Sequence, residues 1–186
     1  MTDPFEKVAR RWLESFAIDL KDFVHVVCDD GDLDDPLRQA AAGAVLYALA
    51  PGDVVPDSAG PLGYVDDALA LRIVLDEIAT KAPDRFEAYS ERLAELIGPL
   101  EDDIEISREF FGDTYEMFRA RVLAFERLEF KGKRVPDALG DPGWLGDEVS
   151  IAALKHDFKP ADVTSAIKRL HTLPPLFRQK LAPRTK

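Results

Sequence analysis

The sequence predicts an all-α protein, a compact multi-helix bundle built around one central apolar helix. No window alternates polar and apolar residues for long enough to indicate a β-sheet. Apolar residues instead recur every three or four positions over several long segments. One segment, residues 64–79, is apolar around nearly its whole circumference, which is typical of a helix surrounded by other helices.

The first expected helix covers residues 4–27. Asp3 can cap its N-terminus, and Pro4 suits the first helical position, where a missing N–H costs nothing. Its apolar stripe has helical spacing, so we expect it to face the core. The stripe consists of Phe5, Val8, Trp12, Phe16, Leu20, Phe23 and Val27.

The second expected helix, residues 36–49, is rich in Ala and Leu, which favour helices. It should end near Ala50, because Pro51 disfavours a helical conformation at the residue before it. The central helix, residues 64–79, follows after a short segment rich in Asp, Pro and Gly.

Further helices are expected at residues 83–97 and 101–130, the second with a possible kink at Gly112. Together these segments predict one helical domain over residues 1–130.

The remainder of the chain has a different composition. Residues 131–147 are rich in Gly and Pro, which predicts a linker or loop. Residues 148–186 are expected to form short basic helices packed on the main domain.

The charge of this acidic protein is uneven along the chain. The net charge is −11, which argues against nucleic acid as a partner. Residues 155–186 nevertheless hold eight Lys and Arg against two Asp. We expect this basic tail to dock on its own acidic body. An acidic partner and an anionic lipid are alternatives, and RNA is the weakest because no aromatic stacking pattern accompanies the tail.

Composition also indicates the compartment. The single cysteine, Cys28, excludes an intramolecular disulfide and fits a reducing environment. The N-terminus lacks the basic-then-apolar order of a signal peptide. The longest apolar stretch, residues 40–50, is shorter than the roughly 20 residues that span a bilayer. We therefore expect a cytoplasmic protein without integral membrane insertion.

Four carboxylates lie in two turns around the start of the central helix: Asp53, Asp57, Asp66 and Asp67. One interpretation is that they cap helix N-termini and close a turn, because free N–H groups and the helix dipole favour negative charge there. The other is that they bind Mg²⁺, Mn²⁺ or Ca²⁺, because hard cations prefer clustered oxygen ligands.

The same segment resembles the motif of the bacterial YkvA-like family, over residues 36–77. The resemblance implies that the element is important but implies no activity, because the family is a domain of unknown function with some members that look membrane-associated. Ala50 and Gly52 depart from the family pattern. The matching residues are Tyr47, Pro51, Asp53, Pro56, Asp57, Gly63, Tyr64, Asp66 and Asp67.

Motifs of common enzyme classes are missing. There is no phosphate-binding loop with Lys-Ser or Lys-Thr, no GxGxxG, no GxSxG and no HExxH. The three histidines are widely spaced, so any catalysis would depend on carboxylates. The sequence therefore favours a protein without catalytic activity of its own.

Three hypotheses remain. The favoured one is a helical interaction or scaffold module that binds a protein partner or another copy of itself. The second is a metal-binding domain or metal-dependent enzyme that uses the four carboxylates. The third is a peripheral membrane protein, with Val54, Val55 and Leu62 exposed around the Asp-rich loop.

Overall fold

The computed structural model describes residues 3–50 and 54–182. The structure is 78% helical, and the strands among these residues form a single two-stranded hairpin. The predicted all-α class is therefore confirmed.

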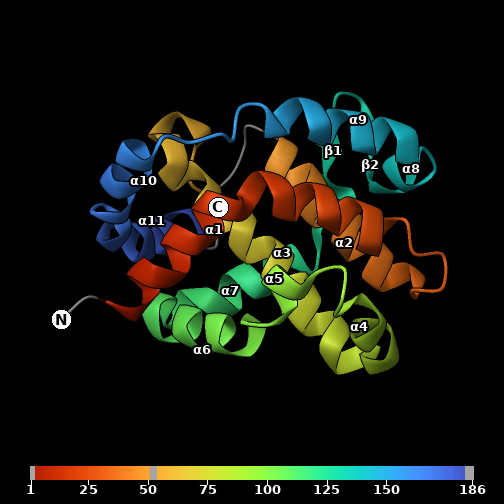
Figure 1. Cartoon of the computed structure of the whole chain (residues 1–186), viewed down its shortest axis with the longest axis horizontal. Coiled ribbons are helices and arrows are strands. Elements are labelled where there is room, and N and C mark those ends of the chain that lie inside the picture. Colours follow the sequence, from red (N-terminus) through yellow and green to blue (C-terminus); the bar gives the residue numbers. More distant parts are fainter. Residues whose placement is uncertain (1–2, 51–53, 183–186) are drawn as a thin grey trace.

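The α-helices are connected by short turns and by 3₁₀ or π segments (Figure 1). They are α1 (Pro4–Phe23), α2 (Asp35–Leu49), α3 (Val65–Lys81), α4 (Pro83–Tyr89), α5 (Ala94–Ile97), α6 (Leu100–Phe111), α7 (Asp113–Val122), α8 (Val135–Leu139), α9 (Pro142–Ala153), α10 (Pro160–Ile167) and α11 (Leu173–Leu181). The shorter turns are η1 (Val24–Cys28), η2 (Asp57–Tyr64), η3 (Phe125–Arg127) and η4 (Leu170–Thr172).

Helix α3 is the centre of the bundle, as the sequence predicts. It contacts α1, α2, α4, α6 and α7, which surround it in Figure 1. From Val65 to Ile78 every side chain except that of Asp76 is buried. An almost continuous apolar helix can be stable in this position because its neighbours shield it from water on all sides.

Helix α1 lies across α3 with its aromatic stripe facing inward. Trp12 and Phe16 are fully buried. The carboxylate of Asp3 accepts a hydrogen bond from the backbone N–H of Phe5 at 2.9 Å, so the expected N-cap is present. The helix continues into the π turn η1, so helical structure covers the predicted residues 4–27 and ends one residue later, at Cys28.

Two of the expected long helices are interrupted. Residues 83–97 form α4 and α5 with a turn between them. The segment 101–130 breaks at Gly112, whose φ of 55° lies in the left-handed region and ends α6. Beyond Val122 the chain forms η3 and a strand rather than a continued α-helix.

The Gly- and Pro-rich stretch 131–147 contains more regular structure than a linker. Strand β1 (Glu129–Phe130) pairs antiparallel with β2 (Lys133–Arg134). The connecting residues Lys131 and Gly132 have φ values of 49° and 79°, as a two-residue hairpin turn requires. Helix α8 and the start of α9 follow directly, so the glycines and prolines here form turns and helix starts.

Apolar side chains attach the C-terminal helices to the body. Helices α9 and α10 contact α1, and α11 contacts α6 and α7. Val163, Leu173 and Phe177 are buried in these contacts. The basic side chains of residues 155–182 are exposed, and within the described part of the chain none of them forms an ion pair with the body. They are Lys155, Lys159, Lys168, Arg169, Arg178 and Lys180.

Candidate functional site

A buried tyrosine and a buried aspartate join the two helices of the Asp-rich element. The hydroxyl of Tyr47, in the last turn of α2, donates to Oδ2 of Asp66, in the first turn of α3, at 2.6 Å. The backbone N–H of Val55 donates to the same oxygen at 3.1 Å. The backbone N–H of Val54 donates to the hydroxyl oxygen of Tyr47 at 2.8 Å. We call these four residues the Tyr47–Asp66 latch.

The latch fixes the loop that enters η2 against the helices on either side of it. Tyr47 is 2% exposed and Asp66 is 0% exposed, so these hydrogen bonds form away from water. The ring of Tyr47 also stacks on Phe125, with centroids 4.6 Å apart. Buried polar groups are costly unless they are paired. The latch therefore stabilises one relative placement of α2, the loop, α3 and η3.

The carboxyl group of Asp66 has an unusual proton affinity. Burial raises its pKa to about 7, against the opposing effect of the hydrogen bonds from Tyr47 and Val55. The nearby charge of Asp57 raises the pKa further. Oδ1 of Asp66 is buried and has no hydrogen-bond partner among the described residues. A carboxyl group with this pKa takes up a proton within the neutral range.

We expect this burial to give a pH-dependent stability that the substitution Asp66→Asn removes. The native pKa lies above the unfolded value, so the native state holds a proton that the unfolded state loses as pH rises from about 4 to about 7. Over that window the wild type should lose stability relative to Asp66→Asn, at no more than about 1.4 kcal/mol per pH unit. Above the native pKa the difference should be constant.

The measurement is urea unfolding of both proteins across this pH range. Asp84→Asn is the matched control, because it replaces an exposed carboxylate in the first turn of α4 that solvent screens. Parallel stability curves for the wild type and Asp66→Asn would contradict the burial argument.

Gly63 and Tyr64 hold η2 between the loop and the C-terminal segment. A Cβ atom on Gly63 would lie 2.8 Å from the carbonyl oxygen of Pro56 and 2.9 Å from Cα of Asp57. Both are backbone atoms, so only glycine allows this close approach. The ring of Tyr64 lies 4.5 Å from that of His156 on its other side. These motif residues are therefore explained by packing.

The predicted metal ligands have different environments. Asp66 and Asp67 are both 0% exposed in the first turn of α3, whereas Asp57 is partly exposed at the start of η2. Asp53, like Pro51 of the motif, lies outside the described residues. Within residues 3–50 and 54–182, no three or more His, Cys, Asp or Glu side chains are arranged to hold a metal ion. A metal site that includes Asp53 stays a prediction.

The exposed apolar loop that the peripheral membrane hypothesis requires is not present. Val54 and Val55 are each 1% exposed and Leu62 is 2% exposed. The latch holds the backbone of Val54 and Val55 against the ends of α2 and α3, which turns these residues into the core. In the part of the chain that the structure describes, no helix combines the length and apolarity needed to cross a membrane.

A second polar cluster, which the sequence analysis missed, lies around Arg72 in the middle of α3. Arg72 is 1% exposed, and its guanidinium lies 3.1 Å from Oδ2 of Asp19 and 3.3 Å from Oδ2 of Asp103. The guanidinium carbon also lies 4.6 Å from the centroid of the Trp12 ring. Arg11 forms a second ion pair with Asp103. We call these residues, together with Ser15, the Arg72 cluster.

The cluster connects three helices through the buried charges of Arg72, Asp19 and Asp103, whereas Arg11 is partly exposed. Ser15 donates to Asp19 at 2.8 Å, and Trp12 Nε1 donates to Asp103 at 2.8 Å. Burial raises the pKa of Asp19 and lowers that of Arg72, while their mutual attraction opposes both shifts. The cluster therefore stabilises the packing of α1, α3 and α6 only while every partner is present.

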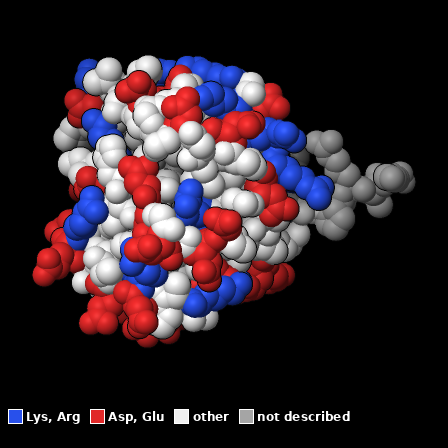
Figure 2. Space-filling view, turned by 90° about the vertical axis from the view of Figure 1, so that its right-hand side faces the viewer, with Lys and Arg blue, Asp and Glu red and all other residues white. Residues whose placement is uncertain are grey.

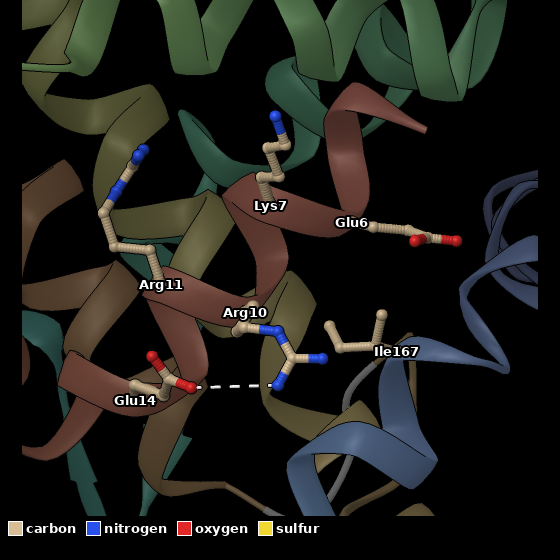
Figure 3. A pocket seen from close by; sticks show the side chains of 6 residues that line it. All are labelled: Glu6, Lys7, Arg10, Arg11, Glu14 and Ile167. Atoms are coloured by element: carbon tan, nitrogen blue, oxygen red, sulfur yellow. Dashed lines mark ion pairs between the residues drawn. The ribbon is translucent and has the colours of Figure 1, made fainter. Parts of the chain in front are cut away.

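A groove of about 230 Å³ lies between α1 and α10 (Figure 3). Arg10 extends toward Ile167, with its guanidinium 3.9 Å from Glu14 and 3.3 Å from the hydroxyl of Thr164. Lys7 extends away from Ile167 in Figure 3. The charges of this groove do not converge on one point, so it does not form an anion site.

A larger groove, of about 810 Å³, lies between α3, α4 and α6. Its apolar lining includes the partly exposed Phe86 and Ile97. Asp76, Glu101 and Glu105 contribute carboxylates to its rim, and Arg108 contributes one cation, 3.8 Å from Asp76. We call it the acidic groove.

Part of the chain matches a known protein family. Residues 38–72 match the model of a family described as a protein of unknown function (DUF1232). No curated protein and no solved structure matches the chain. The matched segment includes most of α2 and the first half of α3, with Tyr47 and Asp66. The chain is thus similar to this family over the segment that forms the Tyr47–Asp66 latch.

Proposed function

We propose that this chain is a YkvA-like protein that acts as a helical interaction or scaffold module without catalytic activity of its own. The observation that carries the proposal is the orientation of Asp66. Its carboxylate is fully buried and accepts hydrogen bonds from Tyr47 and Val55, so it holds the fold together. A catalytic carboxylate must instead reach a substrate.

The surface supports the same proposal. The acidic groove offers apolar side chains within a charged rim, which is the composition of many protein-binding surfaces. The latch and the Arg72 cluster keep the helices around α3 in one arrangement. A rigid arrangement of this kind lowers the entropic cost of binding a partner.

A divalent-cation site at Asp53, Asp57, Asp66 and Asp67 is the second candidate. One observation favours it: Oδ1 of Asp66 is buried without a hydrogen-bond partner among the described residues, close to the charge of Asp57. A hard cation such as Mg²⁺, Mn²⁺ or Ca²⁺ would satisfy such an oxygen and lower the pKa of its carboxyl group.

Thermal unfolding after chelation distinguishes the two candidates. Under the scaffold proposal, adding Mg²⁺, Mn²⁺, Ca²⁺ or Zn²⁺ does not change the melting temperature of the wild type. The cations do not change the melting temperature of Asp67→Asn either. A bound cation at 100 times its dissociation constant would add about 2.7 kcal/mol to the free energy of unfolding, which a melt resolves.

The variant identifies the source of any effect. A rise for one cation in the wild type that disappears in Asp67→Asn would replace the scaffold proposal by a metal site. A rise that the variant keeps would place the cation elsewhere on the protein and would not concern these carboxylates.

A further inference from the structure

Two large apolar side chains are exposed at the end of α9. Leu154, which follows the last residue of the helix, is 80% exposed, and Ile151 is 53% exposed. They are three residues apart, so they lie on one side of the helix. The exposed Lys155 and Lys159 follow them in the chain. We call these four residues the α9 tip.

The acidic groove has the complementary composition. Its partly exposed Phe86 and Ile97 leave apolar surface in contact with water. The segment 84–109, which forms most of its wall, holds nine Asp and Glu against three Arg. Residues 155–182, next to the tip, hold six Lys and Arg against two Asp. The two surfaces are therefore opposite in charge, and both have an apolar centre.

The two surfaces lie on different sides of one molecule. Figure 1 shows α9 along the upper edge and α4 and α6 along the lower edge. Figure 2 shows carboxylates gathered toward the lower part of the face that includes α4. The tip cannot reach the groove of its own chain, and the basic side chains beside it form no ion pair with the body in the described residues.

We propose that the partner of the acidic groove is a second copy of this chain, whose α9 tip inserts Ile151 and Leu154 between the carboxylates of the rim. This inference rests on the proposed function as an interaction module and names its partner. Burial of the two apolar side chains supplies the attraction, and the lysines pair with Glu101 and Glu105.

The contact joins two different surfaces, so it is heterologous. A pair of molecules joined in this way still has one free tip and one free groove, so association continues into rings or open chains. The contact is small compared with a permanent interface, and we expect it to be weak and reversible.

Sedimentation velocity over a range of protein concentrations tests the contact directly. At about 0.02 M salt the wild type should form species larger than a monomer as concentration rises, and about 0.5 M salt should reduce this association because it screens the rim charges. A wild type that stays monomeric at every concentration in low salt would overturn the proposal. This test uses only the wild-type protein.

Two variants separate the two halves of the contact. The tip variant, Ile151→Ser with Leu154→Ser, and the groove variant, Glu101→Lys with Glu105→Lys, should each weaken association at least tenfold. Mixed together they should form a 1:1 dimer and nothing larger, because one supplies an intact groove and the other an intact tip. If the wild type associates but the mixture does not, the assignment of these two surfaces is wrong.

Ile18→Ser is the matched control. Ile18 is 65% exposed on α1, outside both surfaces, so this variant should associate as the wild type does. Loss of association in Ile18→Ser would contradict the proposed contact. Failure of the self-association test leaves the scaffold proposal open to another partner, whereas a cation-specific rise in melting temperature would overturn the scaffold proposal itself.

Discussion

Replacement of Arg72 by Met is expected to destabilise the protein by about 3–5 kcal/mol, the cost of leaving the buried carboxylate of Asp19 without its cation. Asp19 is 4% exposed and would remain inside the bundle, whereas the buried Asp103 keeps its ion pair with Arg11. Methionine fills much of the same volume, so the loss of stability reports the removed charge and not an empty cavity. Chemical unfolding at neutral pH measures this difference.

The stability difference between the wild type and Arg72→Met should decrease at low pH. Burial already raises the pKa of Asp19, and removal of Arg72 removes the attraction that opposes this rise. A group with a raised native pKa destabilises the protein above its unfolded pKa, and protonation removes this effect as pH falls. The variant should therefore come closer to the wild type near pH 4 than near pH 7.

Arg10→Met is the matched control on α1. Arg10 is partly exposed, and its ion pair with Glu14 spans 3.9 Å at the surface. Such pairs contribute less than about 1 kcal/mol. If Arg10→Met and Arg72→Met cost the same, the buried cluster does not stabilise the packing of the three helices.

The all-α class and the central position of α3 could be predicted because they follow from local pattern. Apolar residues on every side of residues 64–79 indicate a helix with neighbours on every side, whichever helices these are. The complete break between α6 and α7 at Gly112, where a kink was expected, and the hairpin turn at Gly132 were harder to predict. They depend on positive φ values that the sequence permits but does not require.

The candidate site could be predicted only in part. Tyr47 and Asp66 stand out in the sequence, but the burial of Val54 and Val55 does not. Their burial results from hydrogen bonds that their backbone N–H groups donate to Tyr47 and Asp66. For the same reason the peripheral membrane hypothesis could place these valines at the surface.

The Arg72 cluster was missed because its partners are distant in sequence. Asp19 lies 53 residues from Arg72, and Asp103 lies 31 residues from it. One signal was present, since an arginine inside a helix that is apolar on all sides requires buried carboxylates somewhere else in the chain.

Tyr47→Phe is expected to cost about 1–3 kcal/mol, because it removes one hydroxyl that both donates and accepts in the latch. The substitution keeps the ring and its stacking on Phe125. It leaves the N–H of Val54 unpaired and removes a donor from Asp66. Chemical unfolding of the wild type and the variant measures the cost.

Tyr115→Phe provides the matched control at a second buried tyrosine. Tyr115 is 0% exposed, and its hydroxyl has no hydrogen-bond partner among the described residues. Removal of that hydroxyl should therefore leave stability unchanged or raise it slightly. Equal losses in the two variants would mean that ring packing, and not the hydroxyl of Tyr47, stabilises the Asp-rich element.

The comparison also bears on function. If Tyr47→Phe is destabilised and Tyr115→Phe is not, the hydroxyl and Asp66 form a structural pair that fixes the loop between α2 and α3. If the destabilised Tyr47→Phe variant still self-associates in low salt, then stabilisation of the bundle and self-association are carried by different residues. The latch would hold the bundle, and the surfaces at the α9 tip and the acidic groove would bind.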